Sequence, residues 1–377
     1  MKNLFYLLFS ILLFTVACKD DDILMDDEGP DENNMDLADI PHDPQPYTIE
    51  APDFLGEMII PEDNPMTVEG VALGRFLFYD PILSADSTQS CSSCHHPAGN
   101  FTDNLAVSVG IDGIAGTRNS MPLLNVGYVT TGFFWDGRAK TLEEQALLPV
   151  EDPIELHETW PNVMSKLREH PDYPKRFREA FDIIDRDEMT KELAAKAIAQ
   201  FERTLVSSGE SKYDRALFGT GVFLSDEELN GSDIFFFEFA NPNESHPGCS
   251  HDACHGSPLF TLNRFTNNGL DAVDDPANFL DLGKGGVTGN LTENGRFRVP
   301  SLRNIALTAP YMHDGRFETL DEVIDHYASG GHPSLTVDSN IGSFTLTEED
   351  RENLKAFLHA QTDTAFTNNP AHQNPFQ

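Results

Sequence analysis

The chain has 377 residues, of which 39% are hydrophobic, a size and composition that suit two domains with ordinary cores. Its formal net charge of −37 argues against nucleic acid as a partner and is compatible with a basic protein or a small solute. Four of its five cysteines lie in two short clusters, so no pair is left for a conventional disulfide framework.

The N-terminus has the pattern of an export signal. Lys2 precedes an apolar run from Leu4 to Val16 that is too short to span a bilayer comfortably. The run ends in Thr15-Val16-Ala17-Cys18, which resembles a lipoprotein cleavage box and predicts a signal peptide over residues 1–18 with lipidation of Cys18. A plain secretory signal is the alternative. We expect an exported protein attached to the outer membrane by its lipid alone, on the periplasmic side or at the cell surface.

An acidic stretch with almost no aromatic residues follows the signal. It predicts a disordered tether over residues 19–47, with order beginning between Pro46 and Pro65. Apolar residues at helical spacing then predict mainly helical structure. The expected helices are Val68–Tyr79, Thr141–Leu148, Trp160–Ala180 with a break near Pro171 and Pro174, and Glu188–Ser207. A glycine-rich loop is expected from residue 96 to residue 132.

The stretch Cys91-Ser92-Ser93-Cys94-His95 is the attachment pattern of a c-type haem. Each thiol can add to one haem vinyl group, and the histidine then lies under the iron as an axial ligand. A structural zinc site is the alternative, but zinc needs four ligands and the next cysteines are far away in the sequence.

The second half of the chain repeats the first half. The matched pairs are Gly74–Phe78 with Gly231–Phe236, Phe101-Thr102 with Phe260-Thr261, Trp135–Glu144 with His313–Glu322, and Phe201–Thr204 with Phe357–Thr362. The same order of matches predicts two tandem cytochrome c-like domains, mostly α with long loops, each built round one covalently bound c-type haem. We place them at residues 48–215 and 216–377.

The second cysteine cluster is irregular. Four residues, rather than two, separate Cys249 from Cys254, and His255 follows directly. The duplicated position favours a second haem with His255 as its axial ligand. A local disulfide and a haem held by a single thioether are the alternatives. His246 and His251 are interpreted as loop histidines.

These motifs together resemble the bacterial di-haem cytochrome c peroxidase superfamily, and within it the MauG-like branch. The resemblance covers residues 68 to 365 and rests on the stretches LGRFLFYDPILS, CSSCHHP, SVG…GTRNS, FFWDGRAKTLEEQALLPV, VPSLRN and APYMHDGRFETLDEV.

Two positions set this chain apart from the two-histidine peroxidases of the superfamily. Those enzymes carry a distal histidine after a Ser-x-Gly stretch, where this chain has Ile111. Isoleucine cannot bind iron, so the first haem is expected to be five-coordinate and open to peroxide. The resemblance also implies that Tyr327, fourteen residues past His313, is the distal ligand of the second haem. His326 and Met312 are the rival ligands.

The resemblance implies further roles. Glu155 would move the proton during peroxide cleavage, Gln145 would hydrogen-bond the bound peroxide, and Trp135 would relay electrons between the haems. Glu151, Asp152 and Glu158 are the acids that a shifted alignment would select instead.

A calcium site between the domains is also implied, with Asn119 and the carbonyl groups of Thr308 and Pro310 as ligands. Arg138 and Arg316 are expected to pair with haem propionates or with neighbouring acids.

The resulting hypothesis is a peroxidase that reduces hydrogen peroxide at the first haem and draws electrons through the second haem from a small cytochrome c or cupredoxin. One alternative is a MauG-like oxidase that modifies tryptophan or tyrosine on a partner protein. The other is a di-haem electron carrier without peroxidase activity.

Overall fold

The computed structural model describes residues 36–219, 221–236, 248–250 and 254–377. The signal peptide, Cys18 and most of the predicted tether lie outside the described residues, as do His246 and His251. Residues 36–377 form one unit of the chain. Within its described part, no helix has both the length and the apolar character needed to cross a membrane.

The structure is mostly helical with little strand, as the sequence predicts. The helices of the first half are α1 (Val68–Tyr79), α2 (Leu142–Glu151), α3 (Trp160–Glu169), α4 (Tyr173–Ala180) and α5 (Lys191–Arg203). Those that follow are α6 (Lys212–Leu217), α7 (Asp226–Phe236), α8 (Lys284–Thr288), α9 (Leu320–Ser329), α10 (Glu348–Ala360) and α11 (Thr364–Thr367). Strands β1 (Phe265–Thr266) and β2 (Phe297–Arg298) form one short antiparallel pair.

The helix boundaries follow local capping signals. The prediction for α1 is confirmed in full, and the predicted break before Tyr173 separates α3 from α4. Helix α5 is shorter than predicted, because the Thr190 side chain caps its start by accepting from the backbone N–H of Leu193. Beyond Arg203 the chain turns away so that Leu205 O can accept a hydrogen bond from Asn125 N.

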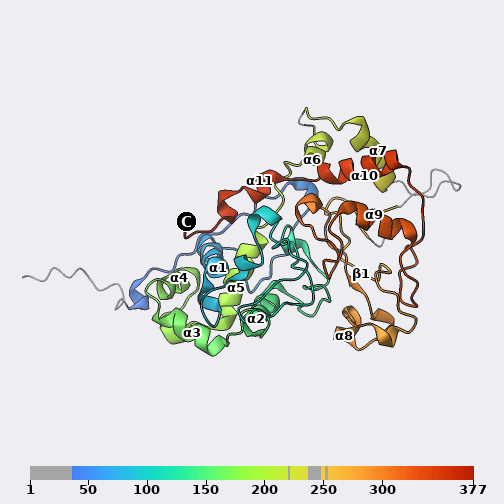
Figure 1. Ribbon diagram of the computed structural model, residues 1–377. Coiled ribbons are helices and arrows are strands. Elements are labelled where there is room, and N and C mark those ends of the chain that lie inside the picture. Colours follow the sequence, from blue (N-terminus) through green and yellow to red (C-terminus); the bar gives the residue numbers. More distant parts are fainter. Residues whose placement is uncertain (1–35, 220, 237–247, 251–253) are drawn as a thin grey trace, which may run out of the picture. The chain divides into compact units, whose positions relative to one another are not determined.

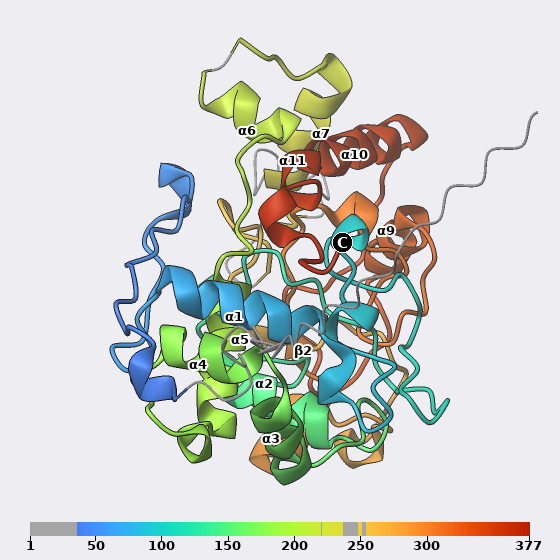
Figure 2. The same cartoon turned by 90° about the vertical axis from the view of Figure 1, so that its left-hand side faces the viewer.

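Each half of the unit is built on one pair of closely packed helices. Helix α1 packs on α5, and α7 packs on α10, with the two pairs in separate regions of the ribbon (Figure 1, Figure 2). Glycine allows each close approach: a Cβ atom on Gly74 would lie 1.8 Å from the carbonyl oxygen of Ala197, and one on Gly231 would lie 1.9 Å from that of Asn353. The repeat seen in the sequence is therefore a repeat of helix packing.

The loops repeat as well as the helices. Asn125 and Asn304 each adopt a left-handed backbone conformation, with φ of 60°, before a short 3₁₀ turn. Phe133 pairs with Ala139 in an isolated antiparallel bridge, and Tyr311 pairs with Phe317 in the same way. Asparagine tolerates the left-handed region better than most residues, which explains why both copies carry it.

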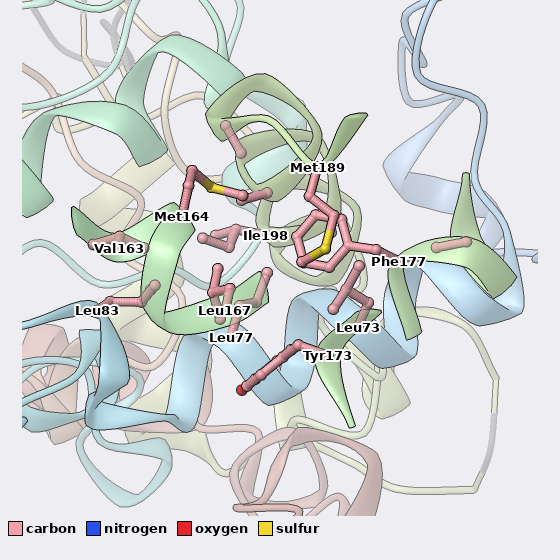
Figure 3. Close-up of a cluster of buried hydrophobic side chains, with 14 of the residues drawn as sticks. Leu73, Leu77, Leu83, Val163, Met164, Leu167, Tyr173, Phe177, Met189 and Ile198 are labelled. Atoms are coloured by element: carbon pink, nitrogen blue, oxygen red, sulfur yellow. The ribbon is translucent and has the colours of Figure 1, made fainter. Parts of the chain in front are cut away.

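The main hydrophobic core of the first half lies between α1, α3, α4 and α5. Leu73 and Leu77 of α1 contribute to it with Leu167 of α3, Phe177 of α4 and Ile198 of α5 (Figure 3). A second core holds the aromatic side chains next to the first cysteine cluster, and a third fills the space between α7, α9 and α10. The sites described below therefore rest on well-packed helices.

The end of the chain returns to the first half. Phe366 of α11 joins the aromatic core that contains Phe78, Phe101 and Phe201. Arg75 of α1 donates to the backbone carbonyl of Gln373. Conversely, Tyr213 of α6 packs in the core of the second half. The chain therefore exchanges short segments between its two halves.

The expectation that order begins after residue 46 is wrong. Leu37 and Ile40 are buried in the main core, and the carbonyl oxygen of Ile40 accepts a hydrogen bond from Nε of Arg178 at 2.9 Å. Tyr47 N donates to the carbonyl oxygen of Met66. Two apolar residues in an otherwise acidic stretch are enough to dock it, although composition predicts a tether.

Candidate functional site

The first cysteine cluster forms a tight turn. Cys91–Ser93 is a single 3₁₀ turn, and the backbone N–H of His95 donates to the carbonyl oxygen of Cys91 at 3.1 Å. The hydroxyl of Ser120 donates to the carbonyl oxygen of Cys94 at 2.8 Å and so ties the turn to the following loop. The turn places both thiols and the imidazole in one short segment.

The ring of His95 is oriented by backbone carbonyl groups. Its Nδ1 lies 2.7 Å from the carbonyl oxygen of Phe101, and the backbone of Met121 provides a second contact. Burial lowers the pKa of His95, which favours the neutral imidazole. A neutral ring that donates through Nδ1 presents the lone pair of Nε2, which is the form that binds iron.

The second cluster reproduces this geometry in spite of its longer spacing. The backbone N–H of His255 donates to the carbonyl oxygen of Cys249 at 3.1 Å, as His95 does to Cys91. Nδ1 of His255 lies 3.1 Å from the carbonyl oxygen of Phe260, and the backbone of Pro300 takes the place of Met121. Burial lowers the pKa of His255 to about 4. The residues 251–253 between the cysteines lie outside the described part.

The four thiols fit covalent haem attachment. All are free, so the local disulfide left open by the sequence is not formed. Burial raises the pKa of Cys94 and of Cys254 to about 11, and that of Cys249 to about 12. A neutral thiol can be replaced by a thioether without leaving a charge in the protein interior. In the described part of the chain, no group of three or more His, Cys, Asp or Glu side chains is arranged to hold a metal ion.

Glu155 lies beside the first cysteine cluster. Burial raises the pKa of both Cys91 and Cys94, and the charge of Glu155 adds a smaller part to each rise, so its carboxyl is within electrostatic range of the two thiols. The backbone carbonyl of Glu155 accepts a hydrogen bond from Ile111 N at 3.0 Å, so the isoleucine loop and the glutamate loop are joined. Burial, helped by Asp152, raises the pKa of Glu155 to about 7.

The neighbouring acids are committed elsewhere. Asp152 caps the backbone N–H of Ile154, and Glu158 forms an ion pair with Lys166 at 2.6 Å. Glu151 is exposed at the end of α2. The carboxyl of Glu155, by contrast, makes no hydrogen bond within the described residues. Glu202 is a second buried acid near Cys91: burial raises its pKa to about 8, and its Oε2 also has no hydrogen-bond partner there.

Gln145 lies on α2 and is partly buried. Its backbone N–H donates to the carbonyl oxygen of Thr141, and its side-chain amide has no hydrogen bond to the described residues. Arg138 is close enough to Glu155 to lower its pKa and lies over the ring of Phe134. Because its side-chain amide has no hydrogen bond to the described residues, Gln145 is free to bind a ligand.

Trp135 lies where the two halves meet. Its indole Nε1 donates to the carbonyl oxygen of Asn119 at 2.8 Å, and its own carbonyl accepts from Arg298 N. Asn119 N donates in turn to the carbonyl oxygen of His313, the residue that matches Trp135 in the repeat. Trp135 is thus held by its indole to the first half and by its backbone carbonyl to the second half.

The residues named for calcium lie in neighbouring segments. Asn119 is joined through its backbone to His313, and Thr308 and Pro310 lie shortly before His313 in the chain; both Asn119 and Thr308 are buried. The side-chain Nδ2 of Asn119 donates to the carbonyl oxygen of Leu105 at 2.7 Å. This bond fixes the amide and leaves its oxygen free for another partner.

Tyr327 faces the second cysteine cluster. Burial raises its pKa to about 12, and Cys254 and Cys249 contribute to the shift. Its hydroxyl lies 3.3 Å from Nδ2 of Asn268, which also lies 3.5 Å from the sulfur of Met312. His326 instead uses its Nε2 to bond the carbonyl oxygen of Asn268 at 3.0 Å. Tyr327 and Met312 therefore both contact the side-chain amide of Asn268, whereas the Nε2 of His326 is engaged by the backbone carbonyl of the same residue.

The two arginines of the repeated turns pair with acids. Arg138 contacts Asp136 at 3.3 Å, and Arg316 contacts Asp271 at 2.7 Å and Asp314 at 2.5 Å.

Sequence reasoning missed the buried Arg298. It also missed the carbonyl groups that orient the two histidines, although the repeated Phe-Thr pair after each cluster marks two of them.

Comparisons with known proteins find several similar chains. Residues 68–221 match the family described as di-haem cytochrome c peroxidase. The chain is 35% identical to the methylamine utilization protein MauG of Methylorubrum extorquens over 298 residues, 79% of each chain. It is 36% identical to the cytochrome c551 peroxidase of Nitrosomonas europaea over 262 residues, 70% of this chain and 73% of the relative. The crystal structure of a MauG-like protein associated with microbial copper homeostasis is similar with a TM-score of 0.79 and 34% identity, over 88% of this chain and 100% of that one.

Proposed function

The chain belongs to the di-haem cytochrome c peroxidase family, and on this basis we propose that it reduces hydrogen peroxide to water. The two c-type haems of the family would be held by Cys91, Cys94 and His95 in the first half. Cys249, Cys254 and His255 would hold the second. The first haem is the peroxide site in this proposal, because its distal loop carries Ile111, which has no ligand atom.

A bound haem would supply the iron that takes up peroxide and delivers electrons to it. The chain contributes the proton chemistry. Splitting peroxide into two water molecules consumes two electrons and two protons, and one proton must move from the near oxygen to the far one. Glu155, with a pKa of about 7, can accept a proton as a carboxylate and return it as a carboxylic acid at neutral pH. This placement of Glu155 is the observation that carries the proposal.

The side chains around Glu155 complete the pocket. The free amide of Gln145 would orient the peroxide by a hydrogen bond. Burial and Asp152 raise the pKa of Glu155, and the positive charge of Arg138 offsets part of that rise. Trp135, bonded to both halves, would shorten the path for electrons that enter through the second haem.

A second candidate function is oxidation of tryptophan or tyrosine on a partner protein. The position of Tyr327 beside the second cysteine pair favours it, because a phenolate ligand stabilises oxidised iron and suits an enzyme that stores oxidising equivalents. Its similarity to proteins named MauG supports the same candidate. In either case the acidic chain suits a basic protein partner. We retain a bound calcium ion as part of both proposals.

One assay separates the two candidates. The haem-loaded protein is mixed with peroxide and an excess of reduced, basic cytochrome c, and oxidation of the donor is followed by absorbance. Rapid turnover with both haems returning to their resting spectra supports the peroxidase. Slow donor oxidation with a persistent oxidised spectrum supports the second candidate. A protein that leaves peroxide untouched in this assay would be an electron carrier, and the proposed function would be wrong.

A further inference from the structure

Arg298 is a buried cation without an anionic partner. It lies on β2 with 7% of its surface exposed, and it forms no ion pair within the described residues. Its Nε is buried and has no hydrogen-bond partner there. Its Nη2 reaches only the sulfur of Met121, at 3.4 Å, and sulfur is a weak acceptor.

Other buried arginines of this chain show what Arg298 lacks. Arg303 forms a two-pronged ion pair with Asp214, at 2.7 and 3.0 Å. Arg203 is 2.8 Å from Glu143, and Arg178 is 2.8 Å from Asp182. The chain has 62 acidic residues, yet none of the described ones pairs with Arg298. A guanidinium group keeps its charge in a protein interior, so an anion from outside the polypeptide is needed to balance it.

The position of Arg298 identifies that anion. Its backbone N–H donates to the carbonyl oxygen of Trp135, and its side chain touches Met121, whose backbone contacts the His95 ring. Two residues further on, the backbone of Pro300 contacts the His255 ring. Arg298 thus lies in the layer between the two haem histidines. A haem carries two propionate groups, and a carboxylate is the anion that the forked guanidinium group matches best.

We propose that Arg298 binds a haem propionate in this layer and sets the reduction potential of that haem. The inference rests on the proposed function only for the presence of haem, and peroxide turnover is not needed for it. Arg298 occupies the place that Asn119 has in the first repeat, since both precede a carbonyl group that contacts a haem histidine by two residues. At these matched positions the first half carries a neutral amide and the second half an arginine without an anionic partner among the described residues.

A fixed positive charge next to a haem disfavours the ferric form, which has one more positive charge than the ferrous form. Removing it should lower the midpoint potential. A lysine at position 298, which keeps a positive charge of similar reach, should preserve most of the midpoint potential. The proposed thioether bonds would keep the haem attached in each variant, so its potential can be measured in all of them.

The test compares Arg298→Met, Arg298→Lys and the control Arg316→Met, whose arginine already pairs with Asp271 and Asp314. Redox titration followed by absorbance gives the potentials of both haems, and resonance Raman spectroscopy reports the propionate bending modes. For Arg298→Met we expect about a tenfold shift of one haem toward the ferric form, or about 59 mV for one electron, with altered propionate modes. We expect Arg298→Lys and Arg316→Met to change the ratio of ferric to ferrous haem by less than about threefold.

Two results would overturn the inference. Unchanged potentials and propionate modes in Arg298→Met would show that no haem carboxylate depends on this residue. A potential that varies with chloride in the unmodified protein, but not in Arg298→Met, would identify a diffusible anion as the partner. Neither result bears on peroxide reduction, which is measured separately on the same variants, so failure of the proposed function remains distinguishable.

Discussion

Replacing Glu155 with glutamine removes the titrating proton and keeps nearly the same shape. We expect Glu155→Gln to keep both haems and to lose about 10²- to 10⁴-fold in kcat/KM for peroxide, the usual contribution of a positioned acid–base group. In the unmodified protein, kcat/KM should rise with pH up to about 7, because only the carboxylate can accept a proton. The variant should lack this rise.

The same substitution has a predicted effect on stability. The carboxyl of Glu155 titrates near 4.5 when unfolded and near 7 when folded, so the folded state binds its proton more tightly. Stability from this group is full below pH 4.5 and is lost as pH rises through 7. At pH 8 the loss is at most about 3 kcal/mol, since water reaches part of the group. Glutamine does not titrate, so the variant should gain stability relative to the unmodified protein between pH 4.5 and pH 8.

Chemical denaturation at pH 4.5 and pH 8 measures the stability difference, and peroxide kinetics on the same samples measure the catalytic loss. Glu151→Gln is the matched control, because Glu151 is exposed at the end of α2, four residues before Glu155. It should change neither quantity. If Glu155→Gln turned over peroxide normally, or if its stability difference did not grow with pH, the assignment of Glu155 as a buried acid–base group would be wrong.

Three further predictions follow from single contacts. Tyr327→Phe should alter the absorption and EPR spectra of the second haem while His326→Gln leaves them unchanged, and identical spectra for both variants would reject tyrosine as the ligand. Gly231→Ala should cost about 1–3 kcal/mol in chemical denaturation, because the new Cβ atom meets a backbone oxygen at 1.9 Å, whereas Gly342→Ala, with open space around it, should cost little. Asp214→Asn should cost about 3–5 kcal/mol by leaving a buried arginine unpaired, and a thermal midpoint equal to that of the unmodified protein would contradict this.

The sequence predicted features that depend on local order along the chain. The 3.6-residue spacing located α1 and α5, and the order of repeated motifs anticipated the matching helix pairs and turns. The predictions of helices and of repeated turns succeeded because each depends on residues that are neighbours in sequence, so the signal and the structure share one short segment. The cysteine and histidine spacing remains a prediction of two haem sites.

Other features depend on contacts between distant segments and could not be read from the sequence. Docking of Leu37 and Ile40 requires the surface made by α4, more than one hundred residues away. The raised pKa of Glu155 depends on burial, which has no local signature in an acidic chain. The lack of a partner for Arg298 likewise depends on distant segments and has no local signature, whereas Arg138 and Arg316, which stand out in the repeated turns, pair with acids in the structure.

The two halves share a scaffold and differ at a few positions where the chemistry takes place. Trp135 in one half is His313 in the other, and the preceding residue, which has a positive φ in both, is Phe134 or Met312. The scaffold positions, such as the glycines at the helix crossings, are under the same packing constraint in each copy, so they stay alike. Side chains that face a haem are free of that constraint. A duplicated fold can therefore differ in chemistry between its halves by changing those few residues, and the proposed open and closed haems would be distinguished at such positions rather than in the fold itself.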